Sequence, residues 1–501
     1  MMAQPSSVAP ATTDPPPAAT PRWAISRGGL FAFLAVLLPA AASLLAPVLT
    51  TDISYHIATG RRLLEEGAIP RSDPFTFTAY GEPWINQQWL ASGIFAVAFD
   101  TTGWLGLLLL RALLIGLAFG LVFTACRAAG SNRIVSSLVT LAAFVVAAPN
   151  LALRSQLFGV LAFAAVLALL AWRRKHPLLL WLVPLVMLAW ANTHGSFFMG
   201  WLAIGLAVLE DIVERRRAAG MTVAVGIVSI AVTLLNPWGL EMWRYVVQLT
   251  GDPLIKSLVT EWQAPTLQDP SGIFFFVSVG LVVLLLLIRG RVLSWLQLAW
   301  LGGLVVLGLL ASRNVVWWAL GAAPLAALLV SGLRLRGRRL GDASADAPRG
   351  AGYTVMAGLA TMLVLLFLPV WKPADALYGP ESVVADAPRG VTETLRRDAM
   401  PGQRLYAEQR WGSWFEQALP DLPVMVDTRI ELFDADIWAD YLHIRAGRAD
   451  WASILDRWDV SLVALAATDD QLRPFLEVSP GWELRFADDE GAAYRRVGSS
   501  D

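Results

Sequence analysis

Long apolar runs separated by short polar stretches fill most of the first 371 residues. A helix needs about 20 apolar residues to cross the hydrocarbon core of a bilayer, and runs of that length recur here. We therefore predict about eleven membrane-spanning helices. They cover residues 28–50, 103–125, 134–150, 156–172, 177–192, 196–213, 220–236, 272–289, 292–311, 315–333 and 353–371.

Two segments outside these runs have a different pattern. Residues 84–99 are apolar but short, and Asn86, Gln87 and Gln88 interrupt them, so we place this segment in the membrane interface or folded back. The first 24 residues are mainly Pro, Ala, Thr and Ser, which predicts a disordered tail. A cleaved signal peptide is the alternative for the first run, but its apolar character continues to Val48, which favours an uncleaved span.

The arginines predict the orientation. Clusters of basic residues follow alternate predicted spans, and basic loops remain in the cytoplasm. They are Arg127 with Arg133, Arg173–Lys175, Arg215–Arg217, Arg289 with Arg291, and Arg334–Arg339. We expect a multi-pass protein of a bacterial inner membrane, with a cytoplasmic N-terminus and a periplasmic C-terminus.

After Trp371 the chain becomes charged and acquires Pro and Gly turns. Short β-like runs at 424–426, 460–466, 482–486 and 493–497 alternate with helical stretches at 437–446 and 452–458. We expect a periplasmic α/β domain over residues 372–501. The predicted organisation is thus a cytoplasmic tail at 1–24, a transmembrane domain at 25–371 with its first periplasmic loop at 51–102, and this C-terminal domain.

Composition supports a membrane protein and excludes some functions. The chain is 56% hydrophobic, with a net charge of -1 and a mean hydropathy of +0.55. Cys126 is the single cysteine, which excludes an internal disulfide and a multi-cysteine metal site. There is no basic tail or basic–aromatic stripe, so we expect no nucleic-acid partner.

The first predicted outer loop opens with a candidate for acid–base chemistry. Asp52 and His56 are four residues apart and would share one face of a helix. They could orient a general base or hold a divalent metal ion. A structural interpretation competes with this one, because Asp52 is also a suitable N-cap for a helix that begins at Ile53.

Further polar residues lie at the ends of later spans on the same predicted side. Arg154 and Arg313 could bind a phosphate or diphosphate, since a guanidinium group matches phosphate oxygens; lipid headgroups or salt bridges are the alternative. Asn192 and His194 lie in the turn between two spans. Ionisable groups near hydrocarbon tend to face cavities or pair with one another. We therefore expect a polar cavity at the outer leaflet.

The predicted C-terminal domain contains an acidic cluster. Asp427 and Arg429 are followed by Glu431, Asp434 and Asp436. These residues could bind an acceptor or a cation at a strand end. We favour the simpler interpretation, a solvated loop in which Asp427 pairs with Arg429.

The overall pattern resembles the GT-C superfamily of membrane glycosyltransferases, especially bacterial members allied to protein mannosyltransferases and arabinosyltransferases. The resemblance is carried by Asp52–His56 with Gly60, by the segment 69–78 around Pro70 and Asp73, and by two motifs, Asn192–Gly195 and Ser312–Asn314. It covers the membrane part in architecture and the first loop in motif. Many members have paired acidic residues in that loop, whereas Thr51 and Ile53 flank Asp52 here.

The resemblance implies a GT-C-like helical membrane domain and sugar transfer from a polyprenyl-phosphate donor to a periplasmic glycan, lipid or protein acceptor. In that scheme Asp52 is the catalytic base and His56 its neighbour. Asp73 or Glu261 is a second acidic group for the acceptor or a metal. No cofactor is implied with certainty; if a divalent cation such as Mg or Mn takes part, Asp52 and His56 would hold it. Arg154 and Arg313 hold the lipid phosphate, while Asn192 and His194 line the cavity.

Two other functions stay open from the sequence. A transporter of lipid-linked saccharides would use the same cavity and arginines without a base. A non-catalytic subunit of a membrane assembly, with partner subunits, would keep the fold without the chemistry. Membrane lipids are expected partners in each case.

Overall fold

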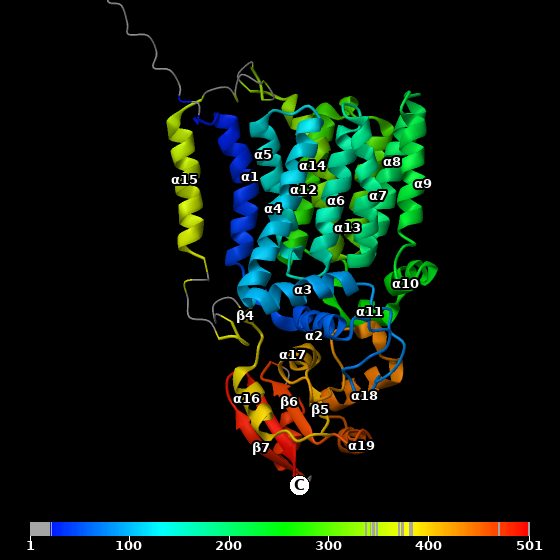
Figure 1. Cartoon of the computed structure of the whole chain (residues 1–501), viewed down its shortest axis with the longest axis vertical. Helices are drawn as coiled ribbons and strands as arrows, with labels where there is room; N and C mark the ends of the chain where they lie inside the picture. Colours follow the sequence, from blue (N-terminus) through cyan, green and yellow to red (C-terminus); the bar gives the residue numbers. More distant parts are fainter. Residues whose placement is uncertain are drawn as a thin grey trace, which may run out of the picture.

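The computed structural model describes residues 21, 23–335, 338–340, 342, 346, 349–368, 371, 375–379, 384–468 and 471–498. The predicted tail therefore lies almost wholly outside the described residues. In the described part, helices form a bundle at one end of the molecule, and a smaller domain with a sheet forms the other end (Figure 1).

Six described helices are long and apolar enough to cross a membrane, and five shorter apolar helices run beside them (Figure 1). The six are α1 (Arg27–Leu45), α4 (Trp104–Ala128), α5 (Arg133–Ala147), α8 (Phe198–Val213), α12 (Pro270–Arg289) and α14 (Val315–Ser331), the last four lengthened by 3-10 turns. The shorter helices are α6 (Gln156–Trp172), α7 (Val183–Thr193), α9 (Ala219–Val232), α13 (Trp295–Leu310) and α15 (Ala351–Leu366). Each predicted span corresponds to one of these helices, and the fold class predicted from the sequence is confirmed.

The first and last apolar helices end earlier than predicted. Helix α1 ends at Leu45 and not near residue 50, and α15 ends at Leu366 and not near residue 371. At α1 the reason is visible, because the buried Arg111 on α4 donates hydrogen bonds to the carbonyl oxygens of Ser43, Ala46 and Pro47. The last carbonyls of a helix have no partner inside it, so this arginine satisfies them and stabilises the helix end.

Two helices lie across the end of the bundle (Figure 1). Helix α2 (Thr50–Glu66) buries Ile53 and Ile57 while its arginines stay partly exposed, and it packs along α3 (Trp89–Thr102). The position of α3 agrees with the interfacial location predicted for residues 84–99. Two further helices, α10 (Leu240–Gly251) and α11 (Pro253–Leu258), lie at the same end.

The C-terminal part is an α/β domain, as predicted. Its four-stranded sheet has the order β5-β6-β8-β7, with β5 parallel to β6 and the other pairs antiparallel. The strands are β5 (Leu405–Ala407), β6 (Leu462–Ala466), β7 (Trp482–Ala487) and β8 (Gly491–Arg496). The helices are α16 (Arg389–Asp398), α17 (Gln409–Ala418), α18 (Ala435–Arg445), α19 (Trp451–Arg457) and α20 (Arg473–Val478).

One predicted strand is wrong. Residues 424–426 form no regular strand, because Val424 makes only isolated bridges, to Thr76 and to Leu405. Through Val424, these bridges connect the first outer loop with the edge strand β5. We did not predict strand β5 from the sequence. Packing of α17 on α2 and the pairing of β1 (Val48–Leu49) with β4 (Val384–Ala385) fasten the domain to the bundle.

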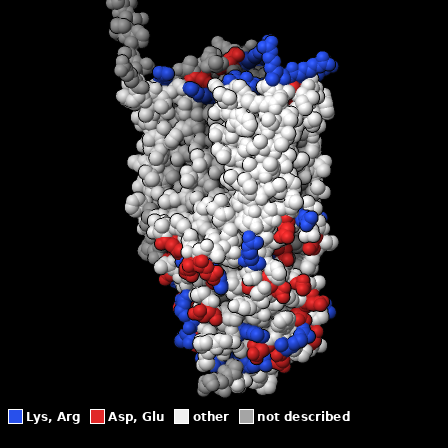
Figure 2. Space-filling model, turned by 45° about the vertical axis from the view of Figure 1, so that its right-hand side comes forward, with Lys and Arg blue, Asp and Glu red and all other residues white. Residues whose placement is uncertain are grey.

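Charge is distributed unevenly along the molecule. The loops with clustered basic residues, including the short hairpin of β2 (Arg334–Leu335) and β3 (Arg338–Arg339), lie at the bundle end opposite the C-terminal domain. Figure 2 shows basic side chains at that end, an uncharged middle and mixed charges on the C-terminal domain. Basic loops thus occupy one side of the bundle, and the assignment of that side to the cytoplasm stays a prediction.

Candidate functional site

His56 faces inward from α2 and is buried. Its Nδ1 lies 2.8 Å from Ser92 Oγ on α3. The preceding residue, Tyr55, donates its hydroxyl to Gln88 Oε1 at 2.9 Å, and Ser155 at the start of α6 donates to the same oxygen at 2.8 Å. The side chains of α2 are thus held by hydrogen bonds to both α3 and the bundle.

Burial, followed by the positive charges of Arg154 and Arg429, lowers the pKa of His56 to about 3. Desolvation disfavours the charged imidazolium, and nearby cations add to this effect. His56 is therefore neutral near pH 7. A neutral imidazole can accept or donate a hydrogen bond, but it supplies no positive charge for a phosphate.

Asp52 lies in the first turn of α2, one turn before His56. The helix begins at Thr50 and its N-cap is Leu49, so the N-cap interpretation of Asp52 is wrong. Its side chain lies outside the described residues, and its role as a base stays a prediction. Among the described His, Cys, Asp and Glu side chains, no group of three could hold a metal ion.

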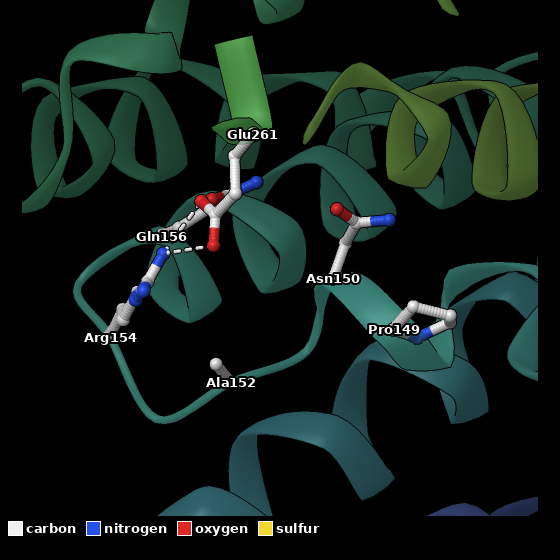
Figure 3. A pocket seen from close by; sticks show the side chains of 6 residues that line it. All are labelled: Pro149, Asn150, Ala152, Arg154, Gln156 and Glu261. Carbon is white, nitrogen blue, oxygen red and sulfur yellow. Dashed lines mark hydrogen bonds and ion pairs between the residues drawn. The ribbon is translucent and has the colours of Figure 1, made fainter. Parts of the chain in front are cut away.

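Arg154 and Glu261 form a close ion pair across a small pocket (Figure 3). The guanidinium Nη1 lies 2.7 and 2.6 Å from the two carboxylate oxygens of Glu261. Pro149, Asn150, Ala152 and Gln156 complete the lining. The pair brings the turn before α6 against the loop between α9 and α12, two predicted polar elements that are 107 residues apart.

Arg313 lies close to this ion pair in the chain's tertiary structure. Its guanidinium carbon lies 4.6 Å from the centre of the Trp262 ring, next to Glu261. The backbone N–H of Ser312 donates to the carbonyl of Gln263 at 2.8 Å, which fixes the turn that carries Arg313. Arg154 thus contacts Glu261, and Arg313 contacts the neighbouring Trp262 but is absent from the lining of the pocket, so the cavity predicted around both arginines stays a prediction.

Asn192 and His194 are buried at the same end of the bundle but are absent from the lining of this pocket. The Asn192 side chain accepts from Trp89 Nε1 at 3.0 Å and donates to two backbone carbonyls. His194 Nδ1 lies 2.8 Å from Ser196 Oγ. Burial, followed by the charge of Arg313, lowers the pKa of His194 to about 3. These contacts stabilise the turn between α7 and α8.

Arg429 of the C-terminal domain forms a buried ionic cluster that sequence reasoning did not find. Its side chain is 1% exposed. Nη2 donates to Asp73 Oδ1 at 2.8 Å, Nε donates to Asp427 Oδ2 at 2.9 Å, and Glu416 Oε1 lies 3.4 Å away. The predicted Asp427–Arg429 pair is present, but both residues are buried and not solvated. The acidic residues of the predicted cluster that follow them are exposed, namely Glu431, Asp434 and Asp436.

Asp73 is committed to this cluster. Besides Arg429, its carboxylate accepts from the backbone N–H groups of Phe75 and Thr76 and from the Thr76 hydroxyl. The rings of Trp84, Phe75 and Tyr55 surround the guanidinium, with centres 4.6, 5.3 and 5.9 Å from its central carbon. A buried carboxylate with four donors is suited to holding the first outer loop against the C-terminal domain.

The cluster extends toward α10. Tyr245 donates its hydroxyl to Glu431 Oε1 at 2.8 Å. Of the acidic residues after Arg429, Glu431 thus contacts the membrane part. The sequence signal was limited to the spacing of Asp427 and Arg429, because nothing local pairs a loop near residue 73 with a turn near residue 429.

Comparison with known proteins rests on structure. No protein-family model matches the chain, and no curated protein matches its sequence. Among solved structures, the oligosaccharyltransferase AglB from Archaeoglobus fulgidus, in complex with an inhibitory peptide and a dolichol-phosphate, is similar with a TM-score of 0.57 and 12% identity. The alignment covers 87% of this chain and 69% of AglB.

Two further structures are similar over nearly all of this chain. ArnT from Cupriavidus metallidurans, bound to undecaprenyl phosphate, has a TM-score of 0.51 and 15% identity over 93% of this chain and 98% of its own. The arabinofuranosyltransferase AftD from mycobacteria has a TM-score of 0.55 and 17% identity, over 94% of this chain and 40% of AftD. The architecture of this chain is therefore the GT-C fold of membrane glycosyltransferases.

Proposed function

We propose that this protein is a glycosyltransferase that moves a sugar from a polyprenyl-phosphate donor to an acceptor on the periplasmic side of the membrane. The observation that carries the proposal is the location of the polar residues. His56 on α2, Arg154 before α6, Glu261 and Arg313 belong to the elements at the bundle end that faces the C-terminal domain, in a fold shared with proteins solved with dolichol-phosphate or undecaprenyl phosphate. Fold alone does not establish activity, so the site has to support it.

The proposed chemistry begins at α2. Asp52 accepts the proton of the acceptor hydroxyl, whose oxygen attacks the anomeric carbon of the donor sugar. The bond between that carbon and the phosphate oxygen breaks, and the polyprenyl phosphate leaves. This single displacement inverts the anomeric configuration. Neutral His56, fixed by Ser92, orients the first turns of α2.

The leaving phosphate needs positive charge, and Arg154 with Arg313 would supply it. Arg154 is paired with Glu261 in this structure, so the donor phosphate has to compete with that carboxylate. We assign Glu261 to keeping Arg154 in place between turnovers. Asp73 is engaged by Arg429, and we assign it to holding the domain. The donor set for a divalent cation is thus limited to Asp52 with His56, whose Nδ1 faces Ser92.

The test is the variant Asp52→Asn in purified protein reconstituted with lipid-linked sugars extracted from the host membrane. Release of polyprenyl phosphate, measured by mass spectrometry, reports turnover whatever the sugar. Loss of a general base costs about 10²–10⁴-fold in rate. We expect at least a hundredfold slower release, with donor binding retained in native mass spectra.

Asp100→Asn is the matched control, because it makes the same chemical change in an exposed ion pair with Arg61 on the interfacial helices. It is expected to release polyprenyl phosphate at the wild-type rate. Turnover by Asp52→Asn at the wild-type rate would refute the role of Asp52. Release of no polyprenyl phosphate by the unmodified protein would instead favour a non-catalytic subunit or a transporter.

A further inference from the structure

A second hollow lies at the basic end of the bundle, opposite the candidate active site. It is an open hollow of about 220 Å³ between the turn that follows α6 and the loop that joins α8 to α9. Its lining consists of Arg173, Arg174, Pro177, Leu180, Asp211, Arg216, Arg217, Ala218 and Thr222. The proposed sugar transfer uses none of these residues.

Buried carboxylates hold the wall of this hollow in place. Asp211 is almost fully buried and accepts from Arg173 Nη2 at 3.1 Å and from Thr222 Oγ1 at 2.7 Å. Glu210 accepts from the same Arg173 nitrogen at 2.8 Å, and Arg216 Nε lies 3.5 Å from Asp211. The basic groups are therefore positioned by the protein itself, which lowers the cost of ordering them around a ligand.

The hollow has more positive than negative charge. Four arginines and a single carboxylate line it, and two carboxylates beside the lining, Glu210 and Glu214, pair with three of these arginines. Arg174 is 43% exposed. Arg217 is also exposed, and it makes no ion pair with any residue that the structure describes. An anionic group is the ligand that such a surface binds, and guanidinium groups match phosphate oxygens.

Apolar side chains distinguish a lipid from a soluble anion. Pro177, Leu180 and Ala218 form part of the lining. Just outside it, exposed apolar side chains continue along the 3-10 turn Pro177–Leu182 and the end of α8. They are Leu178, Leu179, Trp181, Ile212 and Val213. A molecule that fits both parts has an anionic head and an acyl chain.

We propose that this hollow is a binding site for an anionic phospholipid. The phosphate diester lies among Arg174, Arg216 and Arg217, and an acyl chain runs over Leu180 toward Ile212 and Val213. Basic pockets between membrane helices on the cytoplasmic side bind anionic headgroups in general. The site would anchor α7, α8 and α9 in the inner leaflet.

Native mass spectrometry of the purified protein tests this, with dioleoyl-phosphatidylglycerol as the probe and dioleoyl-phosphatidylcholine as the neutral comparison. Two variants address the two parts of the site. Arg217→Gln removes one phosphate contact and is expected to weaken phosphatidylglycerol binding about fivefold. Ala218→Trp fills the hollow and is expected to remove the tightest bound lipid.

Arg291→Gln is the matched control, because Arg291 is an exposed arginine at the same end of the bundle but outside the hollow. The affinity of Arg291→Gln for phosphatidylglycerol is expected to equal that of the wild type. Equal affinity for the two lipids, or equal losses in Arg217→Gln and Arg291→Gln, would overturn the proposal. Competition by glycerol 3-phosphate at the lipid's own concentration would assign the site to a soluble phosphate. Thermal unfolding of each variant checks that it is folded.

Discussion

Asp427 and Glu416 lie in the same buried cluster around Arg429, yet the pKa values of their carboxyl groups shift in opposite directions. Burial opposes ionisation of Asp427, but the charge of Arg429 and the hydrogen bonds with Glu416 and Arg429 together outweigh it and lower the pKa. For Glu416, burial and then the negative charge of Asp427 raise the pKa well above its ordinary value. Glu416 is therefore the carboxyl group that keeps its proton to a higher pH, and Asp427 loses its proton at a lower pH.

This difference predicts opposite effects of two similar substitutions. Asp427→Asn removes one of the acidic partners of the buried Arg429 and leaves Asp73, and breaking a buried ion pair costs about 3–5 kcal/mol of stability. Glu416→Gln puts a neutral amide in place of a carboxyl group whose pKa is raised. A raised pKa means that the folded state holds a proton that the unfolded state releases above its ordinary pKa, so stability is lost as the pH rises. Glu416→Gln is expected to unfold at the wild-type temperature at pH 5 and at a higher temperature than wild type at pH 8.

Thermal unfolding of the purified variants at both pH values measures these effects. Equal destabilisation by the two substitutions would contradict the assigned ionisation. The exposed pair of Arg473 and Glu477 supplies a control, since Arg473→Met should cost at most about 1 kcal/mol.

Single residues also show where sequence reasoning ends. The spacing of Asp52 and His56 predicted a shared helix face, and a helix does cover both. The pair of Asp427 and Arg429 was likewise predictable, because a single residue separates them in the sequence. Its burial was not, because burial depends on Asp73 and Trp84, which belong to a loop more than 300 residues earlier.

At the scale of elements, the contact between α2 and α3 depends on Gly60. A Cβ atom at this position would lie 2.1 Å from the carbonyl oxygen of Ser92 and 2.7 Å from Ala96 Cβ. Gly60→Ala therefore forces the two helices apart and separates His56 from Ser92. Overpacking of this kind costs about 1–3 kcal/mol, and we expect a lower unfolding temperature together with slower release of polyprenyl phosphate.

Gly93 on α3 is the matched control. A Cβ atom there meets only Leu63 Cδ2, at 3.2 Å, which is the mobile end of a side chain. Replacing a helical glycine by alanine stabilises a helix by about 0.5–1 kcal/mol, so Gly93→Ala is expected to unfold at or above the wild-type temperature. A loss as large as that of Gly60→Ala would show that close backbone approach is not the cause.

The elements themselves were largely predictable from hydropathy, because a helix in lipid must satisfy its own backbone and needs a minimum apolar length. The residues at which the helices and strands begin and end were less predictable. Arg111 sets the end of α1 from a neighbouring helix, and no pattern within residues 28–50 shows this. Strand β5 has three residues and is recognisable only beside β6.

At the scale of the whole molecule, orientation is the open prediction. The buried Cys126 is the single cysteine, so introduced cysteines can be labelled against a low background. Ser453→Cys places a thiol on the C-terminal domain, and Arg291→Cys places one at the basic end. In intact spheroplasts, a membrane-impermeant maleimide should label Ser453→Cys and leave Arg291→Cys unlabelled until the cells are opened. The reverse pattern would invert the topology and remove the proposed site from the periplasm.

The pairing of β1 with β4 has a consequence for biosynthesis. Val48, two residues before α2, is paired with Val384; Val48 follows the first apolar helix and Val384 follows the last one described. Chains emerge from the ribosome N-terminus first, and contacts between distant residues form late. The start of α2 can therefore reach its final position only after all the apolar helices have been inserted and the segment beyond them has been exported. A nascent chain arrested before residue 384 would have its membrane helices but would still lack an assembled centre for sugar transfer.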